Sequence, residues 1–176
     1  MEIKIEPMEF FHAVDTARSR MMVSMAMRMN AATTYERSLN QRMNEEVIGA
    51  VGEIAIAKTL NAFHIGSVNT FHRVPDCIAD TEVRSTPLEN GSLIIRDNDA
   101  NDRYYVLVVG EAPKVRIVGW ILGEDAKQDK WIRNPHGHRK AWFVPQEALF
   151  AWEMRLNQIK REAQLKSSAP IIQEYE

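Results

Sequence analysis

The chain has 176 residues, of which 45% are hydrophobic and 26% charged, and its formal net charge is −2. This composition is typical of an ordinary soluble domain, and the charge does not by itself indicate a nucleic-acid binder, although a basic face can exist on such a chain. The single cysteine, Cys77, excludes a disulfide within the chain, and no apolar run approaches the 18 residues of a membrane helix. We therefore expect one domain that works in the cytoplasm.

The first part of the chain is predicted to contain a short strand or ordered arm within residues 1–7 and then a helix. From residue 8 to about 29, apolar residues recur at steps of three and four. We expect this helix to pack on the core through the stripe Phe11, Val14, Ala17, Met21 and Met25. Its five methionines between positions 21 and 29 allow a second interpretation, a soft surface for a partner. Its arginines, which form either a phosphate-contacting patch or a solvated face, are Arg18, Arg20 and Arg28.

After a polar connection over residues 30–40, a second helix is predicted from about residue 44 to 61. It is apolar around most of its circumference, so we expect it to be largely buried. Gly49 and Gly52 lower its helix propensity, a cost that close packing on a sheet offsets. Glu53 lies in this apolar surround, and a buried carboxylate requires a partner. From the residues alone, that partner is a Lys or Arg side chain, or solvent at the edge of the helix.

The stretch 72–86 is predicted to form two short strands. Asp76 lies near the end of the first, and Glu82, Val83 and Arg84 lie on the second. Because strand side chains alternate between faces, Glu82 and Arg84 point the same way and Val83 points the opposite way. The simplest alternative is a surface hairpin whose charges face water.

A turn at residues 78–80 brings Asp76 back beside Glu82. Two carboxylates held that close repel each other unless a cation or a proton lies between them. Mg²⁺ accepts such oxygen ligands while it keeps several waters, and this is the chemistry of metal-assisted phosphodiester hydrolysis. Asp80 competes with Asp76 as the ligand, because an earlier turn puts it on the strand face of Glu82.

The rest of the chain predicts a sheet and further helices. Strands are expected at 93–95, 104–110, 115–122 and 141–144. The β-branched and aromatic run at 104–110 is the best candidate for a buried central strand. Residues 96–103 are predicted to be an acidic turn, a helix begins near 123–127, and Pro145 opens a last helix that runs to about 166. This order of elements predicts an α/β or α+β sandwich.

Several short motifs, in this order and spacing, resemble those of the PD-(D/E)xK nuclease superfamily, which contains many restriction enzymes, resolvases and phage or plasmid nucleases. The motifs that carry the resemblance are Gly49-Ala50-Val51-Gly52-Glu53, Pro75-Asp76 and Glu82-Val83-Arg84. The segments Gly119-Trp120-Ile121 and Trp142-Phe143-Val144-Pro145 are similar to those of uncharacterised members. The resemblance spans roughly residues 47–149. It departs from the family pattern at Arg84, where the family normally has Lys.

The resemblance implies a restriction-endonuclease-like fold, in which helices flank a mixed β-sheet. The whole chain, 1–176, is then a single nuclease-like domain with an N-terminal helical extension (about 1–40) and a C-terminal helix and tail (about 145–176). The resemblance further implies DNA as the partner and, by analogy with other members, a homodimer. The location is then the cytoplasm, or the host cytoplasm if the chain is phage-encoded.

The resemblance also implies roles for individual residues. Asp76 and Glu82 would ligate Mg²⁺ or Mn²⁺, with Glu53 and the backbone carbonyl of Val83 as further ligands. Arg84 would stabilise developing charge, but a guanidinium group keeps its proton and is therefore a poor proton acceptor. The expected function is therefore a Mg²⁺-dependent DNA endonuclease. The alternative is a catalytically weak or inactive nuclease-fold protein that acts in DNA binding or as a structural protein of a phage or plasmid.

Overall fold

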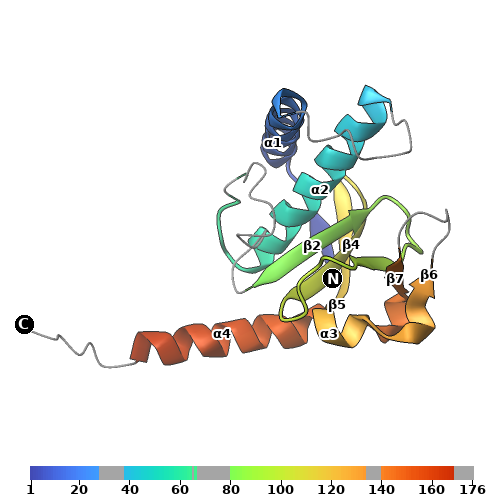
Figure 1. Ribbon diagram of the computed structural model, residues 1–176. Helices are drawn as coiled ribbons and strands as arrows, with labels where there is room; N and C mark the ends of the chain where they lie inside the picture. The colour runs from blue at the N-terminus through green and yellow to red at the C-terminus, as the bar shows by residue number, and fades with distance from the viewer. Residues whose placement is uncertain (28–37, 65, 67–79, 134–139, 169–176) are drawn as a thin grey trace, which may run out of the picture.

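The computed structural model describes residues 1–27, 38–64, 66, 80–133 and 140–168 (Figure 1). Two long helices come first, after one short strand. The helices and strands are, in chain order, β1 (Glu2–Lys4), α1 (Pro7–Ala26), α2 (Leu39–Thr59), β2 (Thr81–Thr86), β3 (Leu93–Arg96), β4 (Tyr104–Glu111), β5 (Lys114–Leu122), α3 (Gly123–Ala126), β6 (Ile132–Arg133), β7 (Ala141–Val144) and α4 (Trp152–Ser168). Short 3₁₀ turns at Asp129–Trp131 and Gln146–Ala148 precede β6 and α4.

The strands form two sheets. The larger sheet has the order β1-β5-β4-β2, in which β4 pairs with β2 in parallel and with β5 antiparallel. The smaller sheet is antiparallel, with the order β3-β7-β6. The fold is thus mixed α/β: two N-terminal helices pack against a mixed four-stranded sheet, beside a small antiparallel sheet and a C-terminal helix. The predicted central strand is confirmed, because β4 lies between two neighbouring strands and its middle residues, 105–109, are buried.

The alternation of side chains along β4 divides the interior into two cores. Val106 and Val108 point to the core beneath α2, whereas Tyr105, Leu107 and Val109 point to the core shared with the small sheet. Figure 1 shows α1 and α2 together on one side of the large sheet, and α4 along its far end. The two faces of β2 therefore meet different environments.

The predicted core-facing stripe of α1 is confirmed for Ala17, whereas Val14 and Met21 are only half-buried. The buried residues of this helix are Ala13, Thr16, Ala17 and Arg20, whereas Phe11 and Met25 are exposed. Small residues on the inner face let α1 approach α2 closely, and Met8, Met22 and Met25 are left on the outside. Arg20 is buried, so it belongs neither to a phosphate-contacting patch nor to a solvated face.

The second helix begins earlier than predicted. Ser38 caps α2 by accepting a hydrogen bond from the backbone of Gln41, whose side chain accepts one from the Ser38 backbone. The two glycines of α2 differ. A Cβ on Gly52 would lie 1.9 Å from Oγ of Ser85 on β2, whereas a Cβ on Gly49 would meet nothing within 4 Å. The predicted close packing is confirmed for Gly52 alone.

Two further predictions need correction. Asp80 is an exposed turn residue with φ of 54°, so it precedes β2 rather than sharing a strand face with Glu82. Pro145 opens a single 3₁₀ turn, and the last helix starts only at Trp152. The first strand of the predicted 72–86 pair lies outside the described residues. In the part of the chain that is described, no helix combines the length and apolar character needed to cross a bilayer.

Candidate functional site

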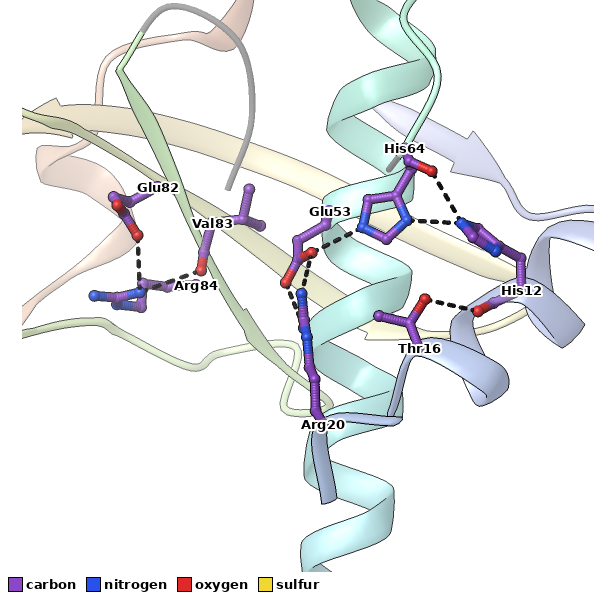
Figure 2. Close-up of polar contacts among 8 residues, drawn as sticks. All are labelled: His12, Thr16, Arg20, Glu53, His64, Glu82, Val83 and Arg84. Carbon is purple, nitrogen blue, oxygen red and sulfur yellow. Dashed lines mark hydrogen bonds and ion pairs between the residues drawn. The ribbon is translucent and has the colours of Figure 1, made fainter. Parts of the chain in front are cut away.

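Glu53 lies in a buried cluster between the two long helices (Figure 2). Its two carboxylate oxygens accept hydrogen bonds from Nη1 and Nη2 of Arg20, each 2.8 Å long, in a two-pronged ion pair between α2 and α1. Nε2 of His64 lies 2.8 Å from the same carboxylate. Burial acts to raise the pKa of Glu53, but the hydrogen bonds from His64 and Arg20 outweigh it and hold the pKa below the ordinary glutamate value.

The cluster continues from His64 to His12 on α1. Nε2 of His12 lies 3.0 Å from the carbonyl oxygen of His64 and 3.1 Å from its Nδ1. The tautomer that suits these distances has Nε2–H of His64 donating to Glu53 and Nε2–H of His12 shared between the two His64 acceptors. Thr16 donates to the carbonyl of His12. This network, which we call the helix cluster (Arg20, Glu53, His64 and His12), ties α1 to the segment that follows α2.

Glu82 lies in a second buried cluster, on the other face of β2. It forms an ion pair with Arg103, and Nη1 of Arg84 lies 3.8 Å from its second oxygen. Arg84 also approaches Asp99, with 3.1 Å between Nη2 and Oδ1, in an ion pair that is not aligned as a hydrogen bond. Its guanidinium stacks over the ring of Tyr105, with Cζ of Arg84 5.2 Å from the ring centroid. We call Glu82, Arg84, Asp99, Arg103 and Tyr105 the strand cluster.

Asp99, Arg103 and Tyr105 are the members of this cluster that the sequence did not single out. Asp99 lies in the turn after β3 and is only 3% exposed. Its Oδ2 accepts from the backbone N–H of Arg96 at 2.8 Å, and Nζ of Lys127 donates to its carbonyl oxygen at 2.6 Å. Burial, and secondarily the charge of Asp99, raises the pKa of Tyr105 to about 12. The acidic turn was predicted, but the sequence carries no signal that one of its three aspartates is buried.

The predicted site residues are brought together only in part. Glu82 and Arg84 share a face of β2, as predicted, and Nη1 of Arg84 lies 3.5 Å from the carbonyl oxygen of Val83. Figure 2 shows Glu53 on the other side of this strand. The packing explains the separation, because α2 contacts β2 through the side chains of Val83 and Ser85. Asp76 lies outside the described residues.

The metal site that the resemblance implies needs several acidic side chains close together. Among the described residues there is no group of three or more His, Cys, Asp or Glu side chains that could hold a metal ion. The carboxylates of Glu53 and Glu82 are separated by β2, and each is already held by arginine. These residues on their own do not fit a Mg²⁺ site. The three-acid site that includes Asp76 stays a prediction.

A pocket of about 420 Å³ adjoins the strand cluster. Arg84 forms one wall, and the exposed Arg96 at the end of β3 forms another. The other residues that line it are polar or apolar and carry no negative charge: Ser85, Thr86, Leu88, Gly91, Ser92, Ile94, Leu107 and Phe143. Two guanidinium groups without an acidic lining residue make this pocket suited to an anion, and its apolar side chains suit a flat or hydrophobic group beside that anion.

The chain was compared with protein-family models, with curated proteins and with solved structures, and none of the three comparisons found a match.

Proposed function

We propose that this chain is a DNA-binding protein on a restriction-endonuclease-like scaffold, and that the pocket beside β2 receives a backbone phosphate. The observation that carries the proposal is the pair of arginines, Arg84 and Arg96, in a pocket without an acidic lining residue, on a chain whose net charge is −2. Guanidinium groups bind phosphate oxygens in pairs of hydrogen bonds. Basic groups gathered at one place are a stronger indication than the overall charge.

The two arginines have different parts in this proposal. Arg84 is held between Glu82 and Asp99, which fix the direction of its guanidinium. Arg96 is exposed, and no described residue forms an ion pair with it, so it brings a charge that is not neutralised by a neighbour among them. The exposed side chains of Leu88 and Ile94 at the same pocket offer apolar contact to a sugar or a base.

A second candidate function is Mg²⁺-dependent hydrolysis of DNA. It is favoured by the side-by-side placement of Glu82 and Arg84 on β2, next to the pocket. Because the described acids do not fit a metal site by themselves, this candidate depends on Asp76, and we derive no hydrolytic step. For the same reason we rank it below DNA binding.

Binding is tested by fluorescence anisotropy with labelled duplex, single-stranded and branched DNA at several salt concentrations. Arg96→Ala is expected to weaken binding about three- to tenfold and to lower the slope of log K against log salt by about one, because one phosphate contact is lost. The matched control is Arg161→Ala, which removes the same charge from the exposed face of α4. Equal affinities for wild type and Arg96→Ala would reject the pocket as the binding site.

Hydrolysis is tested by incubating the same DNA substrates with Mg²⁺ or Mn²⁺. Cleavage by the wild type that disappears in both Asp76→Asn and Glu82→Gln would establish the second candidate. Binding without cleavage in the wild type would leave the first. Circular dichroism of each variant confirms that a loss of cleavage is not a loss of folding.

A further inference from the structure

The outward face of α1 exposes more apolar side chains than a solvated helix needs. Met8, Phe11, Met22 and Met25 are exposed by 76%, 61%, 60% and 43%. In Figure 1, α1 lies at the periphery, beside α2 and away from the small sheet. An apolar face of this kind on a folded chain is typical of a surface that meets a partner.

These residues follow a regular spacing along the helix. Together with two charged residues they recur at alternating steps of three and four, and we call this set the outer stripe: Met8, Phe11, Asp15, Arg18, Met22 and Met25. All six are exposed, whereas the buried positions Ala13, Thr16, Ala17 and Arg20 lie on the opposite side of the helix. Steps of three and four are the spacing by which helices pair in a coiled coil.

Along the helix, the six positions of the outer stripe are spaced symmetrically about the level between residues 16 and 17. We infer that the outer stripe pairs with the outer stripe of a second copy of this chain, with the two helices antiparallel and a twofold axis crossing the contact at that level. In this arrangement each residue meets a suitable counterpart: Met8 faces Met25 of the partner subunit, Phe11 faces Met22 of the partner subunit, and Asp15 faces Arg18 of the partner subunit. A twofold interface brings the same surface of both subunits together, as this pairing requires.

The two charges select this arrangement over others. Within one chain, Asp15 and Arg18 already form an exposed ion pair of 3.7 Å. The antiparallel pairing adds two further attractive contacts between Asp15 and Arg18 of opposite subunits. A parallel pairing instead puts Asp15 opposite the partner's Asp15 and Arg18 opposite the partner's Arg18, and both contacts are repulsive. A charged pair in the middle of the stripe is also unfavourable for a lipid surface. The second copy is therefore the occupant that the charges fit.

The expected complex is of modest strength. The outer stripe spans about 26 Å of helix at 1.5 Å per residue, so the contact lies toward the lower end of stable interface sizes. We therefore expect a dimer that dissociates on dilution. No residue of the outer stripe lines the pocket beside β2, so this inference is independent of the proposed function and can fail separately from it.

Charge exchange tests the pairing in the full chain by sedimentation velocity across a hundredfold range of concentration. Asp15→Arg and Arg18→Asp, each alone, place like charges opposite each other and are expected to raise the dimer Kd by about tenfold or more. Mixing the two variants, or combining them in one chain, restores attraction and is expected to restore the dimer. A wild type that stays monomeric throughout, or single variants that dimerise like the wild type, would overturn the inference.

Cross-linking tests the antiparallel direction. In a Cys77→Ser background, chains with Met8→Cys are mixed with chains with Met25→Cys and oxidised, and we expect disulfides mainly between unlike chains. Disulfides mainly between like chains would overturn the antiparallel arrangement. Met22→Lys is expected to abolish the dimer, whereas the control Met154→Lys, on the exposed side of α4, is expected to leave it unchanged. The reverse result would place the contact elsewhere.

Discussion

Two buried glutamates, one on α2 and one on β2, lie on opposite sides of β2 and have different surroundings. Glu53, in the helix cluster, is bound by both terminal nitrogens of Arg20 and by His64, and each of these side chains is at least 89% buried. Glu82, in the strand cluster, is bound by Arg103 and Arg84, whose side chains are 15% and 27% exposed. Only the strand cluster borders the pocket, through Arg84.

The two clusters differ in exposure and in their contact with the pocket. The helix cluster joins α1 to α2 and to the segment after it, with short, aligned hydrogen bonds and little exposure. The strand cluster includes a partly exposed arginine, Arg84, which lines the pocket beside β2 and lies 3.8 Å from Glu82 and 3.1 Å from Asp99. We therefore expect mutations in the helix cluster to act on stability and mutations in the strand cluster to act on ligand binding as well.

The largest effect is expected for Glu53→Gln. This change leaves the charge of Arg20 buried without its carboxylate, which typically costs about 3–5 kcal/mol of the free energy of unfolding. The measurement is denaturant unfolding followed by circular dichroism, with ligand binding by the residual folded protein measured separately. A loss below about 1 kcal/mol would show that Arg20 finds another partner easily.

Its control removes both charges at once. In Glu53→Leu with Arg20→Met, no unpaired charge remains, and such double replacements of buried ion pairs are often close to neutral. We expect the double variant to recover most of the stability that either single variant loses. Strict additivity of the two single losses would contradict a direct ion pair between them.

A smaller effect on stability is expected for Glu82→Gln, about 1–2 kcal/mol. Arg103 and Arg84 are partly solvated, and Arg84 keeps Asp99, so less of the charge is left unsatisfied. In contrast to Glu53→Gln, we expect this variant to change affinity for DNA, because Arg84 loses one of the two acids that orient it. Anisotropy titrations of both variants, at a temperature at which both are folded, compare the two clusters directly.

Much of the fold was predictable from the sequence. Runs of apolar residues correctly predicted β4, β5 and β7. The alternation of side chains along β2 correctly predicted that Glu82 and Arg84 lie on one face and Val83 on the other. These signals are local, because the burial of a strand determines the pattern of apolar residues within that same strand. The burial of α2 was predicted for the same reason, since its apolar residues surround the helix.

The failures concern contacts between distant segments. The inner face of α1 consists of small residues and Arg20, so hydrophobicity alone wrongly favoured Phe11 and Met25, which are exposed. A basic residue on an otherwise buried face was the available signal that a buried acid, here Glu53, lies opposite it. The separation of Glu53 from Glu82 depends on which face of β2 packs on α2, and Gly52 fixes this through its close approach to Ser85. The sequence predicted the close approach without indicating its side.

The smallest effect on stability at neutral pH is expected for Tyr105→Phe, and the dependence of stability on pH separates the two clusters. Because the pKa of Glu53 is lowered on folding, its contribution is present above the ordinary glutamate pKa of 4.5 and is lost as the pH falls through the folded value. Tyr105 behaves in the opposite way. Its pKa rises from 10.0 to about 12, so the unfolded chain ionises first and stability is lost as the pH rises from about 10 to 12.

Unfolding measured across both pH ranges therefore distinguishes the clusters. Glu53→Gln should flatten the acid limb of the stability profile and leave the alkaline limb unchanged, whereas Tyr105→Phe should flatten the alkaline limb alone. Absorbance of tyrosinate gives an independent reading, because Tyr105→Phe should remove the tyrosine that ionises near pH 12. A Tyr105 that ionises near its ordinary pKa of 10.0 would mean that water reaches the strand cluster, and that Asp99 is not buried against the ring as the structure has it.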